Sequence, residues 1–254
     1  MRIGMSCTSF CTFPPLDILR EVARSFRHWE IFSEVDHAVQ DFDGEFMEAY
    51  RSSGLTYSLH SSIANTDIAA LNPRMRSATL DEFESEMRFA ADAGIDTMTI
   101  HPGLICLSVP GCRERSVAKA NESCKAIEKL ASEYGLTHVC IENMPNVPMM
   151  LGNTAEELGR IVDGTDLGIT FDIGHAHTTN QIDAMVDFFG DRIEHVHIHD
   201  NNGDRDAHMT IGDGSIDFRH VMSRLSGYKG LFIIESRSLE SAIESQKRLR
   251  AMFD

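Results

Sequence analysis

The sequence predicts a parallel β/α barrel, and three observations support this prediction. The chain has 254 residues, close to the ~250 that are typical of one such barrel. Strand-like apolar runs alternate with helix-like segments along its length, a pattern typical of a parallel α/β sheet. Six of the runs end in His, Asp or Glu, as expected where the C-terminal ends of barrel strands build one active site. We therefore expect residues 1–254 to form a single (β/α)8 TIM-barrel domain.

Eight short runs rich in apolar residues are predicted as strands. They are Arg2–Ser6, Trp29–Ser33, Thr56–His60, Thr97–His101, His138–Glu142, Gly168–Asp172, Glu194–His199 and Leu231–Glu235. Apolar residues at helical spacing, together with end signals, predict the helices between them. These run over 14–26, 43–52, 76–93, 116–134, from 154 onward, 180–189, 217–225 and 239–252. Gly94 and Gly135 follow two of them, as glycine often does at helix ends, and Thr154 with Glu157 forms a capping box.

Composition narrows the class of protein. The formal net charge of −16 argues against a general nucleic-acid binder, which usually carries a basic stripe. No apolar stretch approaches the ~20 residues of a membrane span, and the N-terminal residues show no signal-peptide pattern, so we expect no membrane partner and a cytoplasmic location. The six cysteines form no C-x-x-C pair, which predicts reduced thiols, with Cys140 in the core.

The six polar strand ends indicate a metal site. They are His60, His101, Glu142, Asp172, His197 and Glu235. A lone histidine at a strand end is more often a hydrogen-bonded structural residue than a ligand. We expect that plainer role for His28, His37 and His220, and packing or supporting roles for His138 and His195. The plainer role would have to recur independently at six strand ends, which makes it a poor explanation of the pattern.

Further candidates lie just after two of these strands. Asp172 and His175 form a D-x-x-H motif followed by His177, and Asp206 and His208 form a D-x-H motif. Zinc accepts this mixture of imidazole nitrogen and carboxylate oxygen, and an open position on the ion makes such a site catalytic. Mn²⁺ or Fe²⁺ stays open, because the ligand types alone do not select the metal.

These motifs resemble the xylose isomerase-like barrel superfamily, and within it the endonuclease IV family of abasic-site DNA repair enzymes (AP endonuclease family 2). The resemblance runs from His60 to Glu235 and includes the motifs HPG at 101–103, DIGHA at 172–176, HIHD at 197–200 and IGDG at 211–214. It implies three zinc ions held by nine ligands. The matching residues are His60, His101, Glu142, Asp172, His175, His197, Asp206, His208 and Glu235.

The resemblance also implies how these residues divide their work. One ion would take His60, His101 and Glu142; a second would take Asp172, His197 and Glu235 and share Glu142; the third would take His175, Asp206 and His208. Such a centre hydrolyses a phosphodiester, with Glu142 and Glu235 as the catalytic carboxylates and His177 and His199 as supporting residues. Abasic-site DNA is the first candidate substrate, and a small phosphorylated sugar or nucleotide is the second.

Two alternatives stay open. The sugar isomerases and epimerases of the same superfamily use one metal held by the equivalents of Glu142, Asp172, His197 and Glu235, and the two glutamates exchange a proton at a sugar carbon. An acidic end to the second strand, here Glu34, is familiar in that branch. The other alternative is a metal-dependent binding protein without catalysis. The oligomeric state is not predicted.

Overall fold

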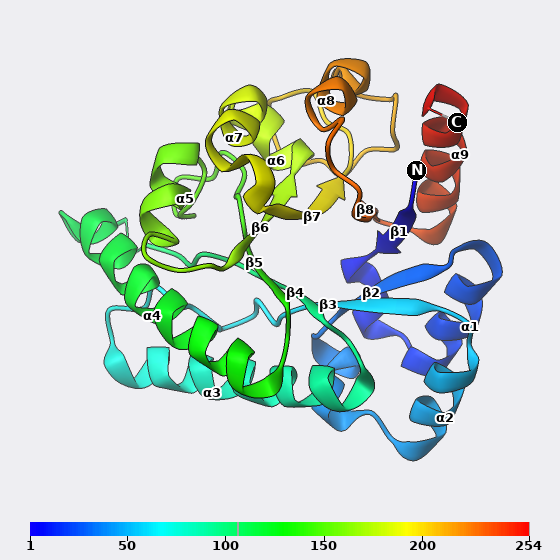
Figure 1. Ribbon diagram of the computed structural model, residues 1–254, viewed down its shortest axis with the longest axis horizontal. Coiled ribbons are helices and arrows are strands. Elements are labelled where there is room, and N and C mark those ends of the chain that lie inside the picture. Colours follow the sequence, from blue (N-terminus) through cyan, green and yellow to red (C-terminus); the bar gives the residue numbers. More distant parts are fainter. Residues whose placement is uncertain (106, 254) are drawn as a thin grey trace.

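A closed barrel of parallel strands forms the centre of the protein, and helices surround it (Figure 1). The computed structural model describes residues 1–105 and 107–253. The strands follow one another around the barrel in sequence order, and β8 pairs with β1 to close it. They are β1 (Ile3–Ser6), β2 (His28–Phe32), β3 (Thr56–His60), β4 (Thr97–Ile100), β5 (His138–Glu142), β6 (Gly168–Asp172), β7 (Ile193–Ile198) and β8 (Phe232–Glu235). The predicted (β/α)8 TIM barrel is therefore confirmed, with strand bounds that differ by one residue at most.

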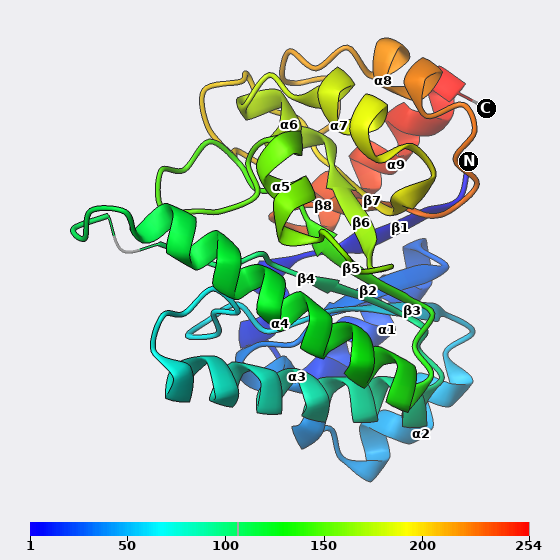
Figure 2. The same cartoon turned by 60° about the vertical axis from the view of Figure 1, so that its left-hand side comes forward.

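Helices occupy the connections between strands. They are α1 (Pro15–Ser25), α2 (Gly44–Ser52), α3 (Pro73–Ala93), α4 (Cys112–Tyr134), α5 (Ala155–Ile161), α6 (Ile173–Thr178), α7 (Ile182–Phe189), α8 (Phe218–Arg224) and α9 (Leu239–Phe253), with the 3-10 turns η1 (Thr8–Thr12), η2 (Val35–His37), η3 (Val39–Asp41) and η4 (Gly190–Arg192). The two longest, α3 and α4, lie side by side on the outside of the barrel (Figure 2). Helix α3 begins earlier than predicted, because Asn72 accepts a hydrogen bond from the Arg74 N–H and Pro73 occupies the first turn.

One helix, α6, is absent from the prediction. Helix α6 begins directly after β6, where the Asp172 Oδ1 accepts a hydrogen bond from the His175 N–H at 2.6 Å. Asp172 thereby caps the helix that carries His175. A helix of six residues is too short to show apolar periodicity, so the sequence pattern gives no sign of it.

The core has an apolar outer layer and a polar interior. Trp29, Ile31 and Ile141 point from the strands toward the helices and are almost fully buried. Alternate positions point into the barrel. There the Thr99 and Thr170 hydroxyls form a hydrogen bond of 2.8 Å between β4 and β6. Polar side chains inside the barrel thus continue toward the C-terminal strand ends, where the candidate ligands lie.

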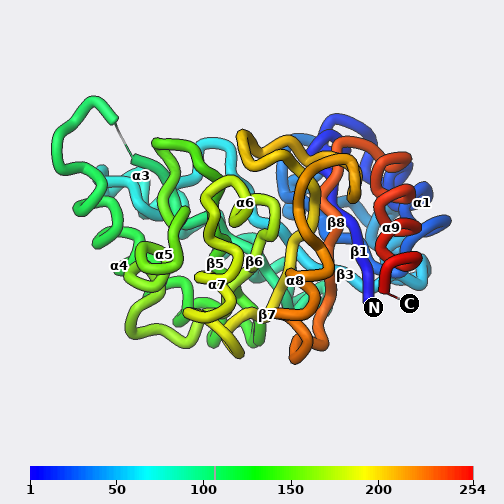
Figure 3. The backbone as a smooth tube through the Cα atoms, turned by 90° about the horizontal axis from the view of Figure 1, so that it is seen from above, coloured from blue at the N-terminus to red at the C-terminus, as the bar shows by residue number. Residues whose placement is uncertain are grey.

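The two termini lie together, because β1 pairs with β8 and α9 follows β8 (Figure 3). In the described ranges, 1–105 and 107–253, none of the helices combines the length and the apolar character needed to cross a membrane.

Candidate metal centre

The nine predicted ligands gather at one rim of the barrel, because parallel strands all deliver their C-terminal ends to the same side. Together with His199 they form three adjoining clusters whose nitrogen and oxygen atoms lie within 4.8 Å of one another. The first cluster is His60, His101 and Glu142; the second is Glu142, Asp172, His197 and Glu235; the third is His175, His199, Asp206 and His208. Residues from the ends of six strands, β3 to β8, thus meet those from helix α6 and the β7–α8 loop in one place.

Glu142 joins the first two clusters. Its Oε2 lies 3.0 Å from His101 Nε2 and 3.4 Å from His60 Nε2. Its Oε1 lies 2.9 Å from His197 Nδ1 in the second cluster. A single buried carboxylate therefore presents one oxygen to each cluster, which is the position that a ligand bridging two cations would take.

The third cluster depends on a folded loop between β7 and α8. The buried Asp200 accepts hydrogen bonds from the Gly212 N–H at 2.8 Å and the Gly214 N–H at 3.0 Å. This holds the loop back over the barrel. It leaves Asp206 Oδ2 3.0 Å from His208 Nε2 and 3.5 Å from His175 Nε2.

Backbone carbonyls fix which imidazole nitrogen faces each cluster. His60 Nδ1 donates to the Ser61 carbonyl at 2.9 Å, and His175 Nδ1 donates to the Asn143 carbonyl at 2.8 Å. A carbonyl oxygen only accepts, so Nδ1 carries a proton, and in the neutral imidazole that binds a metal the lone pair is on Nε2. In both residues Nε2 faces a carboxylate oxygen, and two acceptors facing each other indicate that a cation belongs between them.

His197 has the opposite orientation because of Glu30, a residue that the sequence analysis missed. Glu30 projects from β2 into the barrel and is fully buried. Its Oε1 lies 2.8 Å from His197 Nε2, while its Oε2 lies 2.5 Å from His195 Nε2 and accepts from the Ser58 hydroxyl at 2.7 Å. His197 Nδ1 is therefore the nitrogen that faces the cluster. The sequence indicates Glu30 in one way: it is a charged residue between Trp29 and Ile31 in an otherwise apolar strand.

The electrostatics of the clusters favour positive charge. Burial alone would raise the pKa of Glu142, but His197 and His101 hold that pKa well below its usual range. Burial acts in the same direction on Asp172, yet His175 and His199 lower its pKa to about 2. For His175, burial would lower the pKa, but Asp172 and Asp206 raise it well above the usual value. The lowered pKa values favour the ionised form of Glu142 and Asp172, and their negative charges favour protons or cations beside them.

Several cluster atoms are buried without a hydrogen-bond partner among the described residues. They are Glu142 Oε2, Asp172 Oδ2, His199 Nε2 and Asp206 Oδ1. Leaving such a group unsatisfied costs about 1–3 kcal/mol. Bound divalent cations would relieve this cost for the lone-pair atoms. The mixed nitrogen and oxygen set suits Zn²⁺, with Mn²⁺ and Fe²⁺ also compatible. The residues present therefore fit a metal centre.

The structure places the remaining predicted histidines in different settings. His199 lies inside the third cluster. His177 belongs to none of the three clusters, and its Nε2 lies 3.1 Å from the Ser215 hydroxyl. His28 hydrogen-bonds to Thr56 and Ser58 deep in the barrel, where burial lowers its pKa to about 4.

A small cavity of about 200 Å³ opens over the clusters. Its apolar wall consists of Phe32, Ile63, Met144, Pro145 and Met150. Phe32 also stacks on His60, with ring centroids 4.3 Å apart. The polar lining consists of Thr8, His60, His101, Glu142, His175, Asp206, His208 and Glu235, so lysine and arginine are absent from the described lining.

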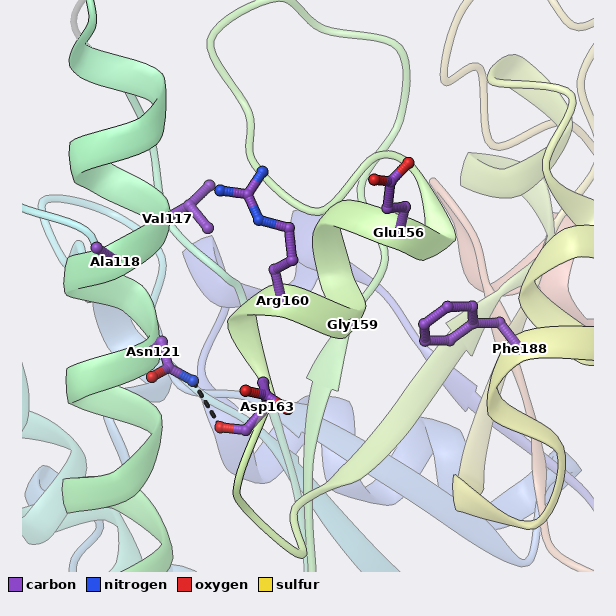
Figure 4. Close-up of a pocket in the computed structure, with 8 residues that line it drawn as sticks. All are labelled: Val117, Ala118, Asn121, Glu156, Gly159, Arg160, Asp163 and Phe188. Carbon is purple, nitrogen blue, oxygen red and sulfur yellow. Dashed lines mark hydrogen bonds between the residues drawn. The ribbon is translucent and has the colours of Figure 1, made fainter.

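A larger cavity of about 460 Å³ lies elsewhere, in the helical layer (Figure 4). Arg160 on α5 lines it and pairs with Glu114, and the Asn121 side chain donates to the Asp163 carbonyl at 2.8 Å. Phe188 of α7 forms its opposite wall. None of the cluster residues lines this cavity in the described part of the chain, so the candidate site is the smaller one.

Comparison with known proteins agrees with the fold. The uncharacterized protein MJ1311 of Methanocaldococcus jannaschii is 30% identical over 98% of this chain and 88% of its own. A solved D-tagatose 3-epimerase-like protein superposes with a TM-score of 0.89 at 30% identity, covering 99% of this chain and 96% of that one. A probable endonuclease 4 of Acholeplasma laidlawii is 27% identical over 58% of this chain and 55% of its own.

These relatives include both a D-tagatose 3-epimerase-like protein and a probable endonuclease 4, so they support an enzyme superfamily without selecting one activity. The family model described as "Xylose isomerase-like TIM barrel" matches residues 19–252. The chain belongs to the xylose isomerase-like TIM barrel family.

Proposed function

We propose that this protein is a metal-dependent hydrolase that cleaves a phosphoester in a small substrate. The observation that supports this most is the lining of the cavity above the clusters. Apart from Thr8, each of its polar residues is a candidate metal ligand. Once those ligands hold cations, few side chains are left to bind sugar hydroxyls, whereas the cations themselves attract an anionic phosphate.

The residues of the site have two roles: some would bind the cations, and others form the apolar wall of the cavity. The three clusters would hold up to three cations, with Glu142 shared between the first two. Bound divalent cations supply charge stabilisation for phosphoryl oxygens and an activated water. Glu142 and Glu235 line the cavity, so their carboxylates would lie beside a substrate bound there. Phe32, Met144 and Met150 exclude bulk water, which strengthens every charge interaction inside.

The same geometry favours a small substrate over duplex DNA. A cavity of about 200 Å³ is smaller than the ~300–1,000 Å³ of most ligand pockets. Arg113, in helix α4 after the fourth strand, is paired with Glu157 at 2.6 Å and so is not free to bind a phosphate. Glu34, at the rim, accepts hydrogen bonds from the backbone of Ile63 and Ala64. This rim has acidic character, which disfavours a phosphate backbone.

A second candidate is a sugar isomerase or epimerase. The second cluster alone, Glu142 with Asp172, His197 and Glu235, can hold one cation between two glutamates. Those glutamates could act as base and acid on either side of a sugar carbon. The 30%-identical structure described as D-tagatose 3-epimerase-like supports this candidate.

One panel of assays separates the candidates. The purified protein, loaded in turn with Zn²⁺, Mn²⁺ and Fe²⁺, is incubated with small phosphomonoesters and phosphodiesters, an abasic duplex and several ketoses, beside the Asp172→Asn variant. We expect phosphate or alcohol release from a small phosphoester, and none from the variant. Epimer formation without hydrolysis would replace the proposal with the second candidate. Retained metal without any turnover would favour a metal-dependent binding protein.

A further inference from the structure

His199 is placed in the way that the cluster ligands are placed. It follows the last residue of β7 and is fully buried. Its Nδ1 donates to the Asp200 carbonyl at 3.4 Å, which leaves the lone pair on Nε2. Nε2 lies 3.3 Å from Asp172 Oδ1 and 3.3 Å from Asp206 Oδ1, without a hydrogen-bond partner among the described residues. His60 and His175 show the same pattern, in which Nδ1 donates to a backbone carbonyl and Nε2 faces a carboxylate oxygen.

Two neighbouring residues, Gly174 and His208, leave space for the His199 imidazole and pack against it. A Cβ on Gly174 would lie 2.0 Å from His199 Cε1, so only glycine leaves room for the imidazole at this point of α6. On the other side, the ring stacks on His208 with centroids 4.1 Å apart and planes 14° apart. The imidazole is therefore held on two sides, with Nε2 directed into the third cluster.

We propose that His199 is a direct ligand of the third cation, together with His175, Asp206 and His208. This inference deepens the proposed metal centre and rests on it. Ligands around tetrahedral zinc, with bonds of about 2.0–2.2 Å, lie roughly 3.3 Å from one another. The distances from Asp206 oxygens to His199, His175 and His208 are 3.3, 3.5 and 3.0 Å.

A fourth protein ligand changes what the third cation does. The expected set of His175, Asp206 and His208 leaves one position of a tetrahedral ion open to substrate. Adding His199 gives three imidazoles and one carboxylate, which closes the site. A closed third site ties the β7–α8 loop to α6 and contributes positive charge, and substrate contact is then confined to the first two clusters.

The experiment measures metal content and coordination rather than activity. The His199→Ala variant is compared with the wild-type protein and with His177→Ala, which removes an imidazole that contacts Ser215 outside the clusters. Zinc per chain is measured by elemental analysis, and the visible spectrum is recorded after replacement by Co²⁺, because four-coordinate Co²⁺ absorbs more strongly than five- or six-coordinate Co²⁺. Free imidazole is then added to the His199→Ala protein.

We expect the His199→Ala protein to lose one equivalent of metal and the strong Co²⁺ absorption, imidazole to restore both, and His177→Ala to match the wild type. Three ions and an unchanged Co²⁺ spectrum in His199→Ala would overturn the role of His199 and leave the trinuclear centre standing. A single ion in the wild-type protein would overturn the centre as well. If His199→Ala fails to fold, as judged by circular dichroism, His199→Asn takes its place under the same criteria.

Discussion

Glu30 provides a sharp test of how the centre is built, because it touches the candidate ligand His197 from behind. Replacing Glu30 with glutamine keeps the size of the side chain and removes its charge. In the native protein its Oε1 lies 2.8 Å from His197 Nε2, and its Oε2 is shared by His195 and Ser58. The glutamine amide has one acceptor oxygen in place of two. One of the donors that now face a carboxylate oxygen must therefore face an NH₂ group.

The size of the effect follows from these contacts. A partner that orients a metal-bound histidine typically contributes 10–100-fold in metal affinity, or about 1.4–2.7 kcal/mol. Leaving one buried donor unsatisfied also lowers the free energy of unfolding by about 1–3 kcal/mol. We therefore expect Glu30→Gln to fold, to melt at a lower temperature, and to bind cations in the second cluster about 10–100-fold more weakly.

Competition with a chromophoric chelator measures this affinity directly. The matched control is Glu194→Gln, which alters a carboxylate–histidine pair, Glu194 Oε2 to His138 Nδ1 at 2.9 Å, near the opposite ends of β7 and β5. We expect the control to retain native affinity. Equal metal affinity in Glu30→Gln and the wild-type protein, with both folded, would refute the claim that Glu30 positions His197.

Three further predictions concern the bridge, a buried acid and the cations themselves. Glu142→Gln should abolish turnover and weaken metal binding in the first two clusters, as seen in elemental analysis after dialysis, whereas retention of all ions would exclude a bridging role. Burial raises the pKa of Glu86 to about 8. The folded state therefore keeps the Glu86 proton to a higher pH than the unfolded chain, and the free energy of unfolding should fall by about 5 kcal/mol between pH 4.5 and 8. Chemical denaturation should show Glu86→Gln losing this part of the pH dependence, and an equal slope in both proteins would contradict it. Removing cations by chelation should lower Tm by roughly 10 °C, the equivalent of ~4 kcal/mol of binding linkage in a chain of this size; an unchanged Tm would mean that the folded state does not hold them.

The sequence predicts the barrel and the gathering of the ligands because both depend on local pattern. Thr56–His60 and Gly168–Asp172 show apolar runs of strand length, and each ends in a polar residue at the position where a parallel strand reaches the rim. The carboxyl ends of parallel strands necessarily share one side of the sheet. His60 and Asp172 are therefore brought to the same rim even though more than a hundred residues separate them.

The remaining features depend on contacts that no local pattern encodes. Glu30 meets His195 across 165 residues of sequence, and only the closed barrel brings β2 and β7 to the same interior point. The sequence pattern predicts only a supporting role for His199, because the space that admits its ring is created by Gly174 on another segment. Helix α6 depends on one cap, Asp172, rather than on periodicity. The width of the cavity depends on side chains from many loops at once.

The most direct test of the metal centre is a crystal structure of the purified protein with anomalous diffraction recorded at the zinc edge, combined with elemental analysis of the same sample. We predict three neighbouring peaks at the barrel rim, one in each cluster, with Glu142 between the first two. A single peak between Glu142 and Glu235, with His60, His101 and His208 turned away from any ion, would contradict the trinuclear centre.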